Sequence, residues 1–210
     1  MNRPLVVTLA LAAAGASARA QTVLLGVHGA LGDYREVSSN LRYGGAGFGG
    51  SLALRVGRLS AEGIVTRISF NPHDKNAGLQ DFKSTQIDAR FGVDISGGLA
   101  AEVGVLRRTI SPELAAQEMG AARLGVRYTK VIGPGATVGL RGNYLAGAKF
   151  TGEGSAGLAF ELGLFASVGP SNGRFRGTAD YGFQRIDRKV GSAKVPIQQS
   201  LVRLGVAVGF

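Results

Sequence analysis

Apolar and polar side chains alternate without a break in Thr85-Gln86-Ile87-Asp88-Ala89-Arg90-Phe91-Gly92-Val93-Asp94-Ile95. The odd-numbered positions from 87 onward are apolar, whereas the even-numbered positions carry Gln86, three charged residues and Gly92. A period of two residues is that of a β-strand, whose successive side chains point to opposite faces. The segment is therefore predicted to be a strand with one apolar face and one ionic face.

The same alternation recurs through the rest of the chain. We expect ten strands, and eight as the second choice, at roughly 22–33, 44–58, 61–70, 85–95, 99–108, 120–130, 136–146, 154–168, 174–187 and 197–210. The predicted connections alternate between long ones at 34–43, 71–84, 109–119, 147–153 and 188–196 and short ones near 60, 96–98, 133–135 and 169–173. Alternating long and short connections are typical of an up-and-down antiparallel barrel in a membrane.

The placement of charge separates a membrane barrel from a soluble one. A cationic side chain facing lipid costs about 2–4 kcal/mol at the bilayer midplane and little near the interface. The alternation assigns these residues to the lumen: Arg55, Arg67, Asp88, Arg90, Asp94, Glu102, Arg108, Arg123, Arg127, Arg141, Glu161, Arg176, Asp180 and Arg203. The charges assigned to the outer face lie near strand ends: Arg58, Glu62, Arg107, Lys130 and Arg185. Because a soluble lipocalin-like barrel would reverse this pattern, the fold class predicted is all-β, a closed antiparallel transmembrane barrel.

The first twenty residues have the pattern of a secretory signal peptide. Arg3 precedes an apolar stretch at 5–14, and Ala18-Arg19-Ala20 matches an A-x-A cleavage site. The apolar stretch is far shorter than the roughly 20 residues of a membrane-spanning helix. We therefore expect residues 1–20 to be removed and residues 21–210 to form one barrel domain.

Composition limits the partners and cofactors. The formal net charge is +10, and loss of Arg3 and Arg19 leaves 22 basic against 14 acidic residues, a net charge of +8. Export removes nucleic acid as a partner, and the charges are spread along the chain instead of forming one basic run. Outer-membrane lipids and lipopolysaccharide are the expected anionic neighbours. The chain has no cysteine, so no disulfide or thiolate metal site forms, and no cofactor or metal is expected.

The last residues resemble the terminal strand of a known family. Leu201-Val202-Arg203-Leu204-Gly205-Val206-Ala207-Val208-Gly209-Phe210 alternates and ends on an aromatic residue. In this respect the mature chain resembles the small outer-membrane β-barrel family, which includes the membrane domain of outer membrane protein A. The resemblance implies a bacterial outer-membrane location with both termini in the periplasm. It also implies recognition of Leu204, Val206, Val208 and Phe210 by the barrel-assembly machinery.

The charged lumen is compatible with three functions. Eight-stranded barrels are filled by side chains, so the first expectation is a packed ionic network in a non-enzymatic protein with a structural or surface-interaction role. The excess of arginine leaves a narrow anion-preferring pore as an alternative. A lipid-modifying enzyme, using His28 or His73 with a nearby serine and acid, is the second alternative. The surface ligand, if any, would bind the polar connections at 71–84 and 188–196.

Two further motifs are assigned from their context. Gly45-Ala46-Gly47-Phe48-Gly49-Gly50 matches the dinucleotide-binding spacing, but the following residues continue as a strand where that motif needs a helix. Glycines facing a crowded interior, or a bulge, are expected there instead. Ser111-Pro112-Glu113 before Leu114-Ala115-Ala116 resembles a helix start, which favours one short surface helix.

Overall fold

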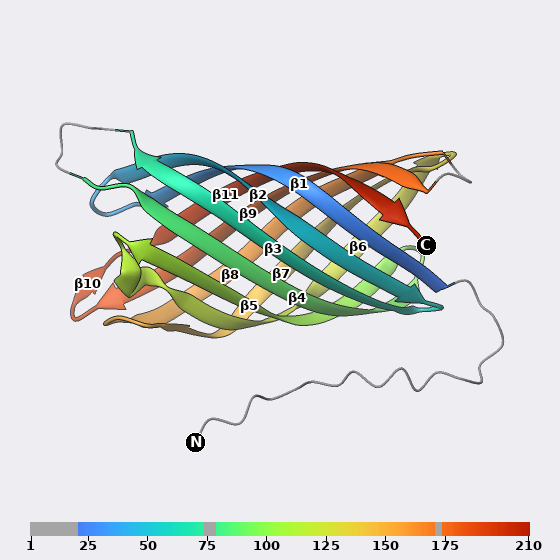
Figure 1. Ribbon diagram of the computed structural model, residues 1–210. Helices are drawn as coiled ribbons and strands as arrows, with labels where there is room; N and C mark the ends of the chain where they lie inside the picture. Colours follow the sequence, from blue (N-terminus) through green and yellow to red (C-terminus); the bar gives the residue numbers. More distant parts are fainter. Residues whose placement is uncertain (1–20, 74–78, 171–173) are drawn as a thin grey trace, which may run out of the picture.

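Ten long antiparallel strands form the molecule (Figure 1). The computed structural model describes residues 21–73, 79–170 and 174–210, so the expected signal peptide lies outside the described residues. The strands are β1 (Gln21–Glu36), β2 (Leu41–Val56), β3 (Leu59–Pro72), β4 (Phe82–Ser96), β5 (Leu99–Pro112), β6 (Met119–Gly133), β7 (Ala136–Phe150), β8 (Ser155–Val168), β9 (Phe175–Val190) and β11 (Ile197–Gly209). A two-residue strand, β10 (Ala193–Lys194), pairs with β9 beyond the main ring.

The sheet closes on itself. Each strand pairs with its neighbour in the chain, and β1 pairs with β11 from Leu24↔Gly209 to Glu36↔Ile197. The backbone of the last residue continues this ladder, because Phe210 N–H donates to the Val23 carbonyl at 3.0 Å. Closure leaves none of the long strands with an unpaired edge, which a barrel in hydrocarbon requires. The prediction of a closed antiparallel barrel of ten strands is confirmed.

The two ends of the barrel differ in their connections. Residues 57–58, 97–98 and 134–135 make two-residue turns at the end where β1 begins and β11 finishes, and β8 ends and β9 begins there (Figure 1). The other end, here called the loop end, carries the connections at 37–40, 73–81, 113–118, 151–154 and 191–196. These are shorter than predicted because the strands continue past the apolar belt, where their outward side chains become polar and the alternation of hydrophobicity disappears.

An apolar belt surrounds the outer wall. On β4 it runs from Ile87 to Ile95, and the side chain of Phe91 is 58% exposed. Eight residue steps of about 3.4 Å, tilted by about 40°, give a belt about 21 Å high. Other exposed members of the belt include Leu25, Val27, Leu31, Phe48, Leu52, Val65, Val103, Val105, Leu124, Val126, Leu140, Tyr144, Leu162, Leu164, Tyr181, Val202, Leu204 and Val206. The height is close to the band of about 25 Å that outer-membrane barrels present to lipid.

The register of β3 differs from the sequence prediction by one residue. Glu62 points into the lumen, and Arg67 points outward and is exposed. The assignments of Arg67 to the lumen and of Glu62 to the outer face are therefore wrong. The physical reason is that the lumen is apolar near the loop end, so Ile64, Ile68 and Phe70 face inward and are buried. Apolar character does not mark the outer face of this strand.

Glycine allows a close approach of β2 and β3. The strand β2 is continuous through Gly45-Ala46-Gly47-Phe48-Gly49-Gly50, as the sequence context indicated. A Cβ atom on Gly47 would collide with the carbonyl oxygen of Arg67, and one on Gly49 would collide with that of Val65.

The expected surface helix is a single 3-10 turn, η2 (Ala115–Gln117). None of the helices in the described residues is long and apolar enough to span a membrane.

Candidate functional site: the filled lumen

An aromatic plug fills the lumen at the loop end. Phe82 stacks on Phe70 with ring centroids 4.8 Å apart, and its edge contacts put Tyr43 at 4.9 Å and Tyr34 at 5.4 Å. All four rings are at most 1% exposed. Aliphatic side chains complete the plug: Ala30, Ile68, Ile110, Ile197 and Leu201. The sequence prediction missed this plug because it assigned apolar side chains to the outer wall.

Polar side chains connect the plug to the loop-end connections. The Tyr34 hydroxyl donates to the side-chain oxygen of Gln117, whose amide donates to Glu36 at 2.6 Å. The Arg108 guanidinium lies 5.6 Å from the centre of the Tyr34 ring and donates to Gln199. The turn η2 thus places a buried glutamine over the plug, and no sequence pattern marks Gln117 for that position.

A layer of buried ion pairs lies below the plug. Arg123 donates to both Asp88 and Glu161, and Arg90 donates to Glu161 and to Glu62 at 3.1 Å each. The side chains of Arg123 and Asp88 are 1% exposed, and that of Glu161 is 5% exposed. Removing one partner of such a pair costs about 3–5 kcal/mol because the other charge stays buried. We call Asp88, Arg90, Arg123 and Glu161 the ion layer.

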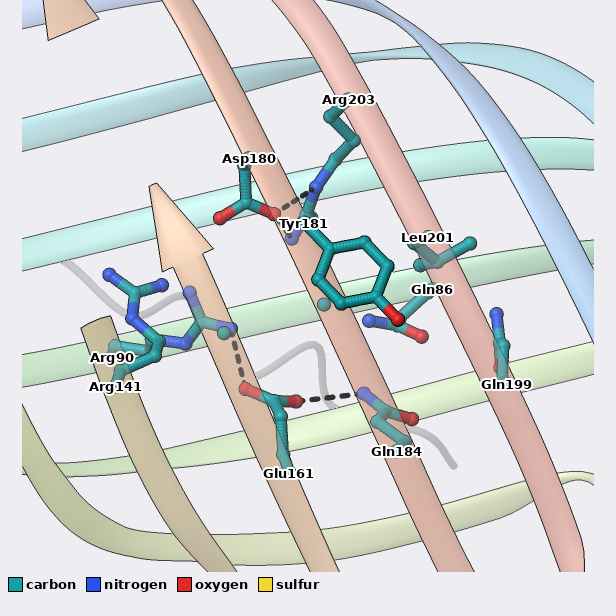
Figure 2. A pocket seen from close by; sticks show the side chains of 12 residues that line it. Gln86, Arg90, Arg141, Glu161, Asp180, Tyr181, Gln184, Gln199, Leu201 and Arg203 are labelled. Carbon is teal, nitrogen blue, oxygen red and sulfur yellow. Dashed lines mark hydrogen bonds and ion pairs between the residues drawn. The ribbon is translucent and has the colours of Figure 1, made fainter. Parts of the chain in front are cut away.

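Two side-chain amides also donate hydrogen bonds to Glu161. Gln184 donates to it at 2.8 Å and Asn143 at 3.2 Å, so its carboxylate accepts from four side chains. Figure 2 shows Glu161 between Arg90 and Gln184, with Arg203 bound to Asp180 beside them. A cavity of about 10 Å³ lies among these side chains, which is about the space of one water molecule. The four side chains of the ion layer are at most 5% exposed, so they fill the lumen at this level.

A larger cavity occupies the half of the lumen nearest the start of β1 and the end of β11. Its volume is about 840 Å³, and turn residues Arg58, Gly97 and Gly98 are part of its lining. Seven arginines and four carboxylates line it: Arg55, Arg58, Arg90, Arg127, Arg141, Arg176, Arg203, Glu62, Asp94, Glu102 and Asp180. We call this cavity the vestibule. Its wall therefore has an excess of positive charge.

Most vestibule arginines are paired. Arg55 donates to Asp94 at 2.5 Å, and Arg127 lies 3.1 Å from Glu102. Arg203 binds Asp180 at 2.5 Å. Arg141 lies 3.3 Å from Glu62 and 3.7 Å from Glu102, and its guanidinium carbon is 5.1 Å from the centre of the Phe165 ring. Among the described residues, Arg58 and Arg176 form no ion pair, so the excess charge is concentrated on them.

The structure places most of the predicted lumen residues inside the barrel. They form the ion layer or line the vestibule: Arg55, Asp88, Arg90, Asp94, Glu102, Arg123, Arg127, Arg141, Glu161, Arg176, Asp180 and Arg203. Arg108 is also inside, beside the plug. Arg67 alone of that set faces outward. Sequence reasoning missed Glu62, Asn143, Gln184 and Gln199. The alternation of β7, β9 and β11 gives the inward direction of the three amides, but only charged side chains were included in the predicted set of lumen residues.

The two histidines have different polar partners. His28 Nε2 lies 3.0 Å from the Thr66 hydroxyl inside the barrel. His73 Nε2 lies 3.8 Å from Asp33 near the loop end of the outer wall. In the described parts of the chain, no group of three or more His, Cys, Asp or Glu side chains is placed to hold a metal ion.

Solved structures with a similar fold are outer-membrane proteins. An outer membrane channel from Pseudomonas putida F1 shares 11% identity over 93% of this chain and 97% of that chain, with a TM-score of 0.54. The outer membrane protease OmpT from Escherichia coli shares 9% identity over 90% and 96% of the two chains, with a TM-score of 0.50. Neisserial surface protein A shares 16% identity over 90% and 97%, with a TM-score of 0.45. No protein-family model and no curated protein sequence matches the chain.

These likenesses concern the fold. Together with the closed ring, the apolar belt and the ionic interior, they show that the chain has the fold of an outer-membrane β-barrel. The proteins of similar fold include a channel and a protease, so the fold alone does not select a function. The side chains that fill the lumen are the features that bear on function.

Proposed function

We propose that the chain is a closed, non-enzymatic protein of the bacterial outer membrane, with a structural or surface-interaction role in the cell envelope. Both termini and the two-residue turns lie on the periplasmic side, and the loop-end connections face the exterior. Short periplasmic turns and longer extracellular loops are the usual arrangement in such barrels. The vestibule then opens toward the periplasm.

The observation that carries this proposal is the filled cross-section between the vestibule and the loop end. The plug contributes rings that are at most 1% exposed, and the ion layer contributes Arg123 and Asp88 at the same exposure. An ion crossing this region would have to separate paired charges and displace packed rings. Both steps cost free energy in a buried site with a low local dielectric constant.

The test is conductance of the purified barrel in a planar lipid bilayer. The proposal expects a conductance near zero at all moderate voltages. The double variant Phe70→Ala/Phe82→Ala tests whether the plug blocks the lumen. It removes two rings of the plug and is expected to produce brief openings. Steady conductance of the wild-type protein would refute the proposal that the lumen is blocked.

A narrow anion-preferring pore is the second candidate, and one observation favours it. The vestibule wall holds seven arginines against four carboxylates, and rings of basic side chains select anions in pores. This candidate requires wild-type currents whose reversal potential in a salt gradient shows anion preference. Neutralising Arg176, an arginine without an ion pair among the described residues, would then reduce that preference.

Assembly is proposed to depend on the outward side chains of β11. Leu204 and Val206 are 62% and 55% exposed, and Phe210 is 69% exposed. They share the outer face of the terminal strand with Val208, where the barrel-assembly machinery could read them. Phe210→Ala is expected to lower the amount of folded protein in the outer membrane. Val65→Ala, at an outward site on β3, is the control, and equal amounts of the two variants would refute this role.

The non-enzymatic assignment is tested through the membrane lipids. Expression of the protein in a host with a defined lipid A, followed by mass spectrometry of the extracted lipid, should give an unchanged lipid A spectrum. A new or lost acyl, phosphate or sugar group that disappears in a His28→Ala variant would establish catalysis instead.

A further inference from the structure

Three basic side chains gather on the outer wall just beyond the apolar belt. Arg67 on β3, Lys83 on β4 and Arg107 on β5 all point outward and are exposed. These strands are neighbours in the sheet, so the three residues form one patch, which we call the basic patch. We propose that the basic patch binds the phosphate groups of lipid A, the phosphorylated lipid anchor of lipopolysaccharide. The proposal rests on the outer-membrane placement proposed above.

The strand register brings the three side chains within reach of one headgroup. Arg67 lies opposite Thr85, and Lys83 is two residues before Thr85 on the same face of β4. Arg107 lies opposite Ile87, two residues after Thr85. Arg67 and Lys83 are diagonal neighbours, which are about 7–8 Å apart. Arg107 lies two strands from Arg67, at about 4.8 Å for each strand, and two residues further along. Long cationic side chains on this spacing can contact two phosphates of one sugar headgroup.

The charge of the patch is not balanced locally. Two other arginines of the outer wall near the loop end have acidic partners, since Arg42 lies 2.8 Å from Asp33 and Arg185 lies 3.2 Å from Asp187. In the described residues, Arg67, Lys83 and Arg107 form no ion pair. The acid nearest to Lys83 along the chain, Asp81, lies just before β4, and the Asn71 amide is within 3.1 Å of its carboxylate.

The surroundings of the patch fit an amphiphilic ligand. Hydroxyl side chains lie between the cations, because Thr85 pairs with Thr109 and Lys83 pairs with both Ser69 and Ser111. Directly below the patch, Val65 and Val105 belong to the exposed apolar belt. A ligand with phosphates at one end and acyl chains at the other would satisfy both levels, whereas free phosphate would use only the upper one.

Binding of diphosphoryl lipid A to the detergent-extracted full chain, followed by native mass spectrometry, tests the proposal. The wild-type protein is expected to retain lipid A. Each single change among Arg67→Gln, Lys83→Gln and Arg107→Gln should weaken binding about 5-fold, and the triple variant about 100-fold, as expected for the loss of one surface cation at a time. Monophosphoryl lipid A should bind the wild-type protein about 5-fold more weakly.

The matched control removes three other cations from the loop end of the outer wall through Arg35→Gln, Arg42→Gln and Arg185→Gln. This control is expected to bind lipid A as the wild-type protein does. The proposal is overturned if the triple patch variant keeps wild-type affinity, if the control loses as much affinity, or if inorganic phosphate at millimolar concentration displaces the lipid. All variants must first migrate as folded barrels in unheated gels. A failed lipid assay together with near-zero conductance would leave the proposed function intact.

Discussion

The ion layer and the vestibule rim, by which we mean the pair Arg55–Asp94, use the same residue types in opposite environments. Arg123 and Asp88 pair where both side chains are 1% exposed, whereas Arg55 and Asp94 pair where the side chains are 62% and 28% exposed. Desolvation makes the first pair costly to break, while water and salt screen the second. Depth in the lumen, and not the presence of an ion pair, therefore decides what a charge contributes to the stability of the barrel.

The largest expected effect is in the ion layer. Glu161→Ala removes an acceptor used by Arg90, Arg123, Asn143 and Gln184. The free energy of unfolding should fall by about 3–5 kcal/mol, because two arginines lose their carboxylate. Urea titration of the barrel in vesicles, read by the gel mobility of unheated samples, measures the change. The isosteric Glu161→Gln is the control and should lose less, and a loss under about 1 kcal/mol in Glu161→Ala would contradict the depth argument.

The plug should give the next effect. Phe82→Ala leaves a cavity among Tyr34, Tyr43 and Phe70 and is expected to cost about 3 kcal/mol. Phe91→Ala on the same strand is the matched control, since its ring is 58% exposed on the belt and leaves no enclosed cavity. The same urea titration compares them. Equal losses for the two variants would mean that the plug is not packed as described.

The smallest effect is expected at the vestibule rim. Arg55→Ala removes the 2.5 Å pair with Asp94, and exposed pairs contribute about 0–1 kcal/mol. The urea midpoint should therefore barely move, and raising the salt concentration should remove what difference exists. A loss of unfolding free energy above about 2 kcal/mol would show that the Arg55–Asp94 pair is less accessible to water than its exposed side chains indicate.

Sequence patterns predicted the wall well and its contents less well. On β4, apolar residues face lipid and charges face the lumen along its middle part, so alternation alone gave both faces. On β3, Glu62 and Arg67 were exchanged because the interior beside Ile68 and Phe70 is as apolar as the belt. Pairing partners such as Arg123 with Glu161 depend on which strands face each other across the lumen, and local periodicity carries no such information.

The ends of the strands were also hidden from the sequence. The strand β7 continues to Phe150, beyond the predicted end at 146, because hydrogen bonding to β6 persists past the belt. Outward residues there, such as Lys149, face water or headgroups and need not be apolar. Strand ends outside the membrane therefore leave no hydrophobic signal, which also concealed the outward position of Arg67.

The central claim is that one face of each strand contacts lipid while the other faces a closed lumen, and adjacent residues of β2 test it directly. The chain has no tryptophan, so Leu52→Trp and Ser51→Trp each introduce a single fluorophore, the first on the belt and the second in the vestibule wall. In vesicles with brominated acyl chains, fluorescence of Leu52→Trp should be strongly quenched and that of Ser51→Trp should stay nearly unchanged. Equal quenching of the two variants, or quenching of Ser51→Trp alone, would contradict the account.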